Sequence, residues 1–190
     1  MFGGSYGHGG DNAREHTISV LVENQPGVLT RVAGMFSRRG FNIDSIVVGA
    51  AEEPGFARMT IVLVGDEREL DQVQKQLHKL IEVIKVSELD PADMVERELA
   101  LIKVNADRSN RAEILQIVDI FRAGIVDVGQ HTVVVEVTGD TKKVEAMVDL
   151  LRPFGIKEIV RTGRVGITRG ARTTGGQGER RRGGLQAVGG

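Results

Sequence analysis

Two consecutive halves of the chain repeat one order of strand-like and helix-like patterns. In the first half, short runs of β-branched and apolar residues alternate with segments whose apolar residues recur at helical spacing. The predicted elements are strand, helix, strand, strand, helix and strand, at residues 16–22, 28–40, 42–49, 56–64, 66–81 and 83–89. This is the βαββαβ order of the ferredoxin-like fold, in which two helices cover one face of a four-stranded sheet.

The second half begins after Asp90-Pro91 and runs through the same order. Its predicted elements lie at residues 99–104, 110–121, 125–128, 131–137, 142–151 and 156–161. We therefore predict an α+β protein with two consecutive ferredoxin-like domains, at residues 16–90 and 96–165. The two halves differ in sequence, so the fold is duplicated without a recognisable sequence repeat.

Several predicted helix ends have residues suited to capping. Gly40 follows the first helix, where a residue in the left-handed conformation commonly ends a helix. Asp66 and Glu69 have the spacing of a capping box, and Asn110 and Glu113 repeat that spacing in the second half.

The two ends of the chain differ in composition from the body. Residues 1–15 are Gly-rich and polar, and we expect them to be disordered. Residues 166–190 form a Gly/Arg-rich tail, and removing residues 171–190 should leave the fold intact because Gly and Arg offer no core. Six of the 25 basic residues but only one of the 26 acidic residues lie in 163–190, so the remaining chain is acidic. An acidic body argues against nucleic-acid binding.

The composition excludes several chemistries. Cysteine is absent, which excludes disulfides, thiolate catalysis and cysteine metal sites. His8 and His16 lie eight residues apart without other ligands nearby, so no metal site is predicted. No apolar run reaches the length of a membrane span, and the first residues do not resemble a signal peptide. We expect a cytoplasmic protein without membrane contact.

The ferredoxin-like fold hosts unrelated activities, and the residues present argue against several of them. An RNA-recognition module would place aromatic residues on its central strands, where this chain has only Phe56. An acylphosphatase-like enzyme would need an arginine in the first strand–helix loop, and residues 24–27 contain none. There is also no Walker loop, no Gly-x-Ser-x-Gly motif and no pair of histidines. The sequence predicts no catalytic residue.

The first strand–helix loop, Glu23–Leu29, is the strongest candidate for a ligand site. Free backbone N–H groups and the positive end of the helix dipole meet at such a position. Pro26 is tolerated in a first turn, and Gly27 lets a small anion approach the backbone. The alternative is a capped turn without a ligand. The corresponding loop of the second half, residues 105–110, lacks the Pro-Gly pair, so we expect one site per chain.

A family resemblance sharpens this prediction. Residues Asn24-Gln25-Pro26-Gly27-Val28-Leu29 resemble the Asn-x-x-Gly-(Val/Ala)-Leu signature of ACT domains, ferredoxin-like modules that sense amino acids. Residues 16–170 as a whole resemble the small regulatory subunits of acetolactate (acetohydroxyacid) synthase. The matching blocks, in chain order, are residues 37–43, 58–60, 75–80, 86–89, 95–99 and 165–170. The ends, 1–15 and 171–190, lie outside the resemblance.

The resemblance implies a non-catalytic subunit that binds and activates the large catalytic subunit of acetolactate synthase, a thiamine-diphosphate-dependent transferase. It also implies feedback inhibition of branched-chain amino-acid biosynthesis by a branched-chain amino acid, usually valine. Thiamine diphosphate, Mg²⁺ and FAD would belong to the large subunit, and this chain would bind no cofactor. The first domain, an ACT domain, would form a homodimer with the effector at the interface.

The effector-binding residues implied by the resemblance are Asn24, Gln25, Pro26, Gly27, Val28, Leu29, Asn42 and Ile43. Backbone amides around Gln25, Gly27 and Val28 would hold the α-carboxylate. Asn24, and Asn42 from the partner chain, would form hydrogen bonds with the polar ends of the effector. Val28, Leu29 and Ile43 would surround the aliphatic side chain.

Alternative interpretations remain for the function and for three features. The chain could be a free-standing ACT-type sensor that regulates another enzyme or transcription. Asn42 could cap a turn, and Val28 and Leu29 could serve only the helix core. The Arg-rich tail could be a solvated end, a contact to the large subunit or a contact to an anion such as nucleic acid.

Overall fold

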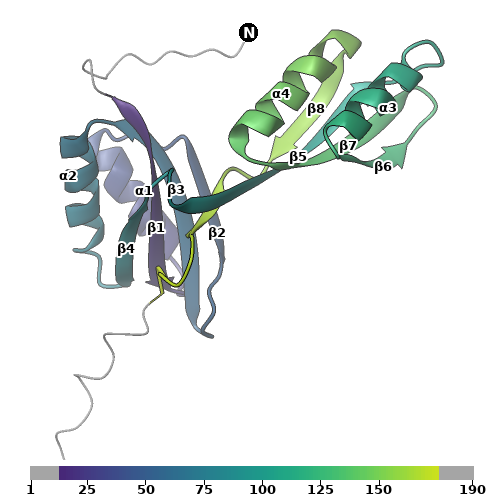
Figure 1. Ribbon diagram of the computed structural model, residues 1–190. Coiled ribbons are helices and arrows are strands. Elements are labelled where there is room, and N and C mark those ends of the chain that lie inside the picture. The colour runs from purple at the N-terminus through teal and green to yellow at the C-terminus, as the bar shows by residue number, and fades with distance from the viewer. Residues whose placement is uncertain (1–12, 176–190) are drawn as a thin grey trace, which may run out of the picture. The chain divides into compact units, whose positions relative to one another are not determined.

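The computed structural model describes residues 13–175 of the chain (Figure 1). The predictions for residues 1–12 and 176–190, including His8 and the arginines after Glu179, lie outside the described residues. The chain divides into two compact units: residues up to Met94 together with those from Ile167 onward, and residues Val95–Gly166. Within residues 13–175, no helix has the length and apolar character needed to cross a membrane.

The first unit contains a four-stranded antiparallel sheet and two helices. Its elements are β1 (Arg14–Glu23), α1 (Val28–Arg39), β2 (Ser45–Ala50), β3 (Phe56–Gly65), α2 (Glu67–Leu77) and β4 (Val83–Leu89). The strands lie in the order β2-β3-β1-β4, so β2 and β4 form the edges. The central strands β1 and β3 pair from Arg14 opposite Gly65 to Glu23 opposite Phe56.

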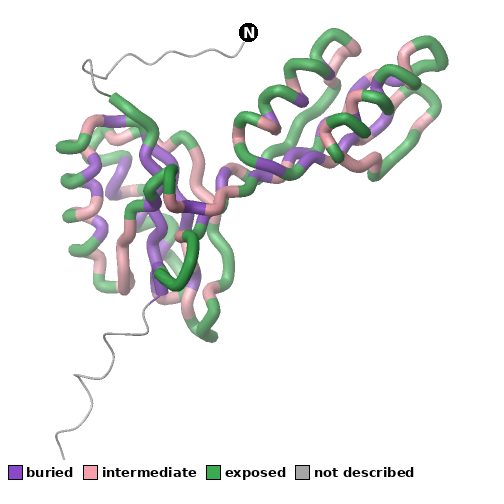
Figure 2. Tube along the Cα trace, viewed as in Figure 1, coloured by how far each residue is buried: buried purple, intermediate pink, exposed green. Residues whose placement is uncertain are grey.

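The core of this unit lies between the sheet and the helices. Ile18, Val20 and Val22 alternate along β1, as expected for a strand that presents one face to a core, and each is at most 1% exposed. They pack with the apolar stripes of both helices, including Phe36 of α1 and Val73 of α2. Along the chain trace, β1 is buried over most of its length, whereas the two helices are buried only at intervals (Figure 2).

Two of the predicted helix ends are confirmed. Gly40 ends α1 with φ of 71°, in the left-handed region, and its N–H donates to the carbonyl of Ser37. Asp66 and Glu69 form a reciprocal capping box at the start of α2, with N–H···O distances of 2.8 and 2.9 Å.

The second unit repeats this architecture. Its elements are β5 (Met94–Asn105), α3 (Arg111–Ile120), β6 (Gly124–Val128), β7 (Thr132–Gly139), α4 (Thr141–Leu151), a 3₁₀ turn η1 (Arg152–Phe154) and β8 (Ile156–Arg161). The strands follow the order β6-β7-β5-β8. Ala100, Ile102 and Val104 of β5 form the core with α3 and α4.

A shared irregularity relates the two units in detail. The pairing of β1 with β4 shifts register between Leu21 and Val22, and the pairing of β5 with β8 shifts between Lys103 and Val104. In each unit, the shift lies just before the C-terminal end of its first strand, β1 or β5. Element order, strand order and this irregularity confirm the predicted α+β architecture of two consecutive ferredoxin-like folds.

The start of α3 is confirmed at Asn110, but the capping hydrogen bonds expected there are not formed. Asn110 is the N-cap residue, adopts a helical conformation, and its side chain makes no capping hydrogen bond to α3. Its Oδ1 instead accepts a hydrogen bond from the N–H of Asp107, at 2.9 Å. The asparagine side chain therefore closes the preceding loop, because the carbonyl that would cap the helix is already engaged.

The chain after Gly166 follows a path that the sequence did not predict. A short strand, β9 (Val165–Thr168), precedes residues 169–175, which we call the C-terminal segment. The hydroxyl of Thr174 accepts a hydrogen bond of 2.6 Å from Nη1 of Arg58, on β3. Nζ of Lys85, on β4, donates to the carbonyl of Gly175 at 3.2 Å. Thr174 and Gly175 are buried. The C-terminal segment thus lies on the face of the first sheet opposite the helices.

Candidate functional site

The β1–α1 loop, residues 24–27, connects the end of a central strand to the start of a helix. The N–H of Glu23 donates to the carbonyl of Glu82, and the N–H of Asn24 donates to the carbonyl of Gly55, both at 2.8 Å. Gly27 is the N-cap of α1 and has φ of 87°, a conformation that L-residues with side chains rarely adopt. Glycine is therefore needed here for the turn itself, independently of any ligand.

The backbone donors of this loop are only partly available. The N–H of Gln25 bonds the carbonyl of Glu23 at 3.0 Å, and the N–H of Val28 bonds the carbonyl of Gln25 at 3.3 Å. Within residues 13–175, the amides of Gly27, Leu29 and Thr30 have no protein acceptor. These three amides lie at the positive end of the helix dipole and can receive an anion.

The side chains of the loop differ in exposure. Asn24, Gln25, Pro26 and Gly27 are exposed. Val28 is 4% exposed and belongs to the core cluster, so its side chain offers little surface to a ligand, whereas Leu29 is 48% exposed.

Charged side chains flank the loop. Nη2 of Arg31, in the first turn of α1, pairs with Oε1 of Glu82 at 3.1 Å. The same nitrogen would lie 3.7 Å from a Cβ added at Gly27. Nε2 of Gln25 donates to Oε2 of Glu23 at 2.7 Å. A cation and two carboxylates beside three free amides suit a zwitterion, which carries both charges. Arg31 and Thr30 were not predicted from the sequence, although both lie within the first turn after Gly27.

Asn42 and Ile43 lie at the other end of α1. The helix has 12 residues, which places its two ends about 18 Å apart at 1.5 Å per residue. Asn42 is exposed, and its Nδ2 donates to Oδ1 of Asp44 at 2.9 Å. Ile43 is half-buried against the core. One chain therefore does not bring these residues to the β1–α1 loop.

The histidine and carboxylate groups do not gather into a metal site among residues 13–175. His16, one of the two histidines considered above, is 2% exposed. Its Nδ1 lies 3.1 Å from Oε1 of Glu88, and its Nε2 lies 3.2 Å from the carbonyl oxygen of Gly65. These contacts join β1 to β3 and β4.

Comparison with known proteins gives matches in both units. A family model described as "AHAS small subunit-like ACT domain" matches residues 18–85, and one described as "Small subunit of acetolactate synthase" matches residues 97–170. The probable acetolactate synthase small subunit of Methanothermobacter thermautotrophicus is 58% identical over 159 residues, covering 83% of this chain and 95% of that protein. The acetolactate synthase small subunit of Mycobacterium leprae is 53% identical over 160 residues, covering 84% and 95%.

A solved structure gives the same result. The crystal structure of the acetolactate synthase small subunit from Thermotoga maritima superposes with a TM-score of 0.78 at 49% sequence identity. The match covers 82% of this chain and 98% of that one. Sequence and fold therefore agree over both units.

Proposed function

Because the chain belongs to the family of acetolactate synthase small subunits, we propose that it binds the large catalytic subunit of that enzyme, activates it and makes it sensitive to a branched-chain amino acid. Valine is the proposed effector, and biosynthesis of valine, leucine and isoleucine in the cytoplasm is the proposed setting. Thiamine diphosphate, Mg²⁺ and FAD would be bound by the large subunit, which would perform the catalysis.

The match of the second unit carries this proposal. A free-standing ACT-type sensor would need only the first unit, whereas residues 97–170 match a family model of the synthase small subunit. The relative from Methanothermobacter is also matched over 95% of its length. Both observations favour a subunit of the synthase over a separate sensor.

The β1–α1 loop is the proposed effector site. The α-carboxylate of the amino acid would accept hydrogen bonds from the free amides of Gly27, Leu29 and Thr30, with Arg31 nearby. This replaces Gln25 and Val28 as the expected backbone donors, because their N–H groups are engaged. The carboxylate of Glu23 and the side-chain oxygen of Asn24 are suitable acceptors for the α-ammonium group.

The site would be completed by a second copy of the chain. Asn42 and Ile43 directly precede β2, which is an edge strand of the first sheet. Antiparallel pairing of two β2 edges across a two-fold axis would also run the two α1 helices antiparallel. The start of one α1 would then lie near the end of the other, and Asn42 and Ile43 of the second copy would reach the loop.

The direct test is to add the purified chain to its large subunit and measure acetolactate formation with and without valine. We expect a higher turnover number on addition of the chain and inhibition by valine only in the complex. Acetolactate formation by the chain alone, or a turnover number that the chain does not change, would contradict the proposal.

A mixed dimer tests the shared site. Asn24→Ala alters one side of each site and Asn42→Ala alters the other side. Each homodimeric variant should bind valine about ten- to a hundredfold more weakly, because a hydrogen bond to a charged group contributes about 1.5–3 kcal/mol. A heterodimer of the two variants has one site with both changes and one unchanged site. In calorimetry, this heterodimer should therefore bind valine with wild-type affinity at half the wild-type stoichiometry. If each site were formed within one chain, both sites of the heterodimer would carry a change and neither would bind with wild-type affinity.

A further inference from the structure

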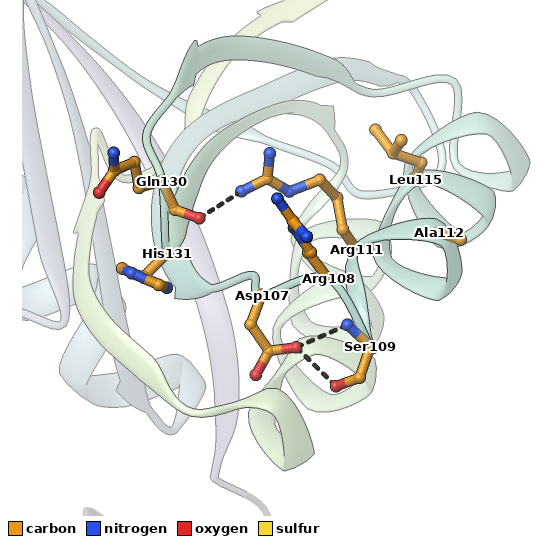
Figure 3. A pocket seen from close by; sticks show the side chains of 8 residues that line it. All are labelled: Asp107, Arg108, Ser109, Arg111, Ala112, Leu115, Gln130 and His131. Carbon is orange, nitrogen blue, oxygen red and sulfur yellow. Dashed lines mark hydrogen bonds between the residues drawn. The ribbon is translucent and has the colours of Figure 1, made fainter.

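The second unit has a pocket at the position that corresponds to the β1–α1 loop of the first unit. We call it the β5–α3 pocket. It lies where β5 passes into α3 and is closed on one side by the turn between β6 and β7 (Figure 3). Its volume is about 1060 Å³, slightly above the usual range of small-molecule sites.

Arg111 is held rigidly in this pocket. Its Nη2 donates to the carbonyl oxygens of Ala106 and Gly129 at 2.8 Å and of Gln130 at 2.9 Å, which joins the loop to the turn. Nε is buried without a hydrogen-bond partner, and Nη1 has no acceptor within residues 13–175. One edge of the guanidinium thus fixes the side chain, and the other nitrogens make no protein hydrogen bond.

Two further basic side chains, both exposed, line the pocket. Arg108 and His131 make no hydrogen bond or ion pair with the described residues, although His131 interacts electrostatically with Asp107. Figure 3 shows the guanidinium groups of Arg108 and Arg111 on the side of the pocket nearest the turn that carries Gln130 and His131. Both guanidinium groups are positively charged, so an anion bound in the pocket would be attracted to both.

The acidic side chain of the pocket is already engaged. Oδ1 of Asp107 accepts hydrogen bonds from the N–H of Ser109 at 2.8 Å and from its hydroxyl at 2.5 Å. These bonds, the one from the hydroxyl foremost, lower the pKa of Asp107 below its ordinary value of 3.8. In Figure 3 this carboxylate turns toward Ser109 and away from the guanidinium groups. It therefore leaves Arg108 and Arg111 without a carboxylate partner.

We propose that the β5–α3 pocket binds a small phosphate oxyanion, either inorganic phosphate or a phosphate monoester. Nη1 of Arg111, the guanidinium of Arg108 and the ring of His131 are its donors. Two permanent cations and an imidazole match a dianion better than a monocarboxylate. Leu115, which is 42% exposed, lines the same pocket and would contact the organic group of a monoester. This site is separate from the effector site proposed above and does not depend on it.

The test uses the full chain, labelled with ¹⁵N, at low ionic strength. Inorganic phosphate is titrated while the backbone amides are followed by NMR. We expect saturable shifts at residues 107–111 and 130–131. Arg108→Gln should weaken binding at least about tenfold, since it removes a charge-assisted hydrogen bond. Arg122→Gln is the matched control, because it removes the same charge from an exposed position beyond the far end of α3.

The outcomes separate the possible ligands. If phenyl phosphate binds more tightly than inorganic phosphate, and Leu115→Ala abolishes the difference, the ligand of the pocket is a phosphate monoester. If the two affinities are equal, the ligand is inorganic phosphate. Shifts that do not saturate, or equal weakening by Arg108→Gln and Arg122→Gln, would overturn the proposal. It would also be overturned if phosphate does not bind and Arg108→Gln instead weakens association with the large subunit, because the arginine would then be a protein contact. The amide spectra report in each case whether the variant is folded.

Discussion

Ser19 of β1 and Leu101 of β5 hold equivalent positions in the two sheets, two residues before the shared register shift. Both point away from the helices of their unit. Ser19, which is polar, is 1% exposed, whereas Leu101, which is apolar, is 37% exposed. The ordinary distribution of polar and apolar residues is therefore reversed at this position.

The C-terminal segment explains the difference. It covers the first sheet at Arg58, whose Nη1 donates to the hydroxyl of Ser19 at 3.2 Å and to the carbonyl of Thr174 at 3.1 Å. Burial of Ser19 leaves no unsatisfied polar group, because its hydroxyl has hydrogen-bond partners. On the second sheet, Leu101 and the neighbouring Val160, which is 56% exposed, have no such cover from the described residues of their own unit.

The strand–helix loops differ in a corresponding way. The β1–α1 loop has an obligatory glycine and three free amides, so its backbone can bind a ligand. The β5–α3 loop is closed by the side chains of Asp107 and Asn110, which bond its own N–H groups. What remains available there is side-chain charge. In the proposals above, the ligand site of the first unit uses backbone donors and that of the second unit uses side chains, on one topology.

The largest effect is expected from removing the C-terminal segment. A chain that ends after Thr168 keeps β9 but loses the hydrogen bonds to the charged groups of Arg58 and Lys85, and the first unit should lose about 3 kcal/mol of unfolding free energy. A chain that ends after Gly175 keeps these contacts and should match the wild type. Amide hydrogen exchange in β1 and β3 measures the effect, with β5 and β7 as an internal control. Equal protection of β1 in both truncated chains would show that the cover contributes no stability.

This expectation revises the one drawn from composition. A truncation from residue 171 was expected to leave the fold intact, yet it removes Thr174 and Gly175, which are buried against the first sheet. Glycine and threonine contribute here through backbone carbonyls and a hydroxyl, which composition does not report.

The next effect concerns the β1–α1 loop. Gly27→Asp should weaken valine binding about a hundredfold, because it places a carboxylate where the ligand carboxylate is proposed to bind. Any side chain at φ of 87° also strains the backbone, so the variant needs a control of the same shape. Gly27→Asn provides it, because asparagine has nearly the same shape as aspartate, strains the backbone to the same extent at this φ and carries no charge. Inhibition curves of the holoenzyme should rank wild type, Asn and Asp in order of decreasing sensitivity. Identical inhibition curves for the Asn and Asp variants would show that the ligand carboxylate does not bind at this loop.

A smaller effect is expected from Thr174→Val, which keeps the shape of the side chain and removes its hydroxyl. Arg58 keeps its bonds to Glu52 and to the carbonyl of Thr174, so we expect a loss of about 1.5 kcal/mol in urea unfolding. Thr173→Val is the control, because the Thr173 side chain is exposed. An equal change in both variants would mean that the Thr174 hydroxyl bond adds nothing specific.

The smallest effect is expected at Glu52. The hydrogen bond from Arg58 lowers the pKa of Glu52 below its ordinary value of 4.5. A carboxylate with a lowered pKa stabilises the fold above its unfolded-state pKa and loses that contribution as pH falls through the folded value. Because the Glu52 side chain is 47% exposed, Glu52→Gln should cost only about 0.5 kcal/mol at pH 7. Urea unfolding at pH 7 and pH 3 should show this difference at pH 7 and little at pH 3. If the difference in unfolding free energy persists at pH 3, it arises from the shape of the side chain and not from its charge.

The local sequence pattern was sufficient for most of the fold. Alternation along 16–22 and helical spacing after Gly27 each report directly on which residues can be buried together, so the element order followed from them. Asp66 with Glu69 and Gly40 act within one turn of chain, and their roles were predicted correctly. Asn110 has the same local spacing but a competing donor, the N–H of Asp107, and the spacing alone could not choose between the two.

The candidate site was predictable only in part. The loop at Gly27 and the family of the chain can be read from residues 24–29 and from the separated matching blocks. Which amides remain free depends on the carbonyls that fold against the loop, such as that of Gly55 from the β2–β3 turn. Arg31 was not recognised because its position beside Gly27 and its pairing with Glu82 depend on the folded backbone.

By itself, the sequence determined the order of the elements, the turns that require glycine, and the family, because each depends on neighbours a few residues apart or on matching residues. The tertiary structure alone decided which sheet face is covered and which arginines lack an acid. Arg58 meets Thr174 across 116 residues of sequence, and Arg111 meets Gly129 across 18. Such contacts arise only when distant segments are brought together, since burial and charge pairing depend on distance in space and not along the chain.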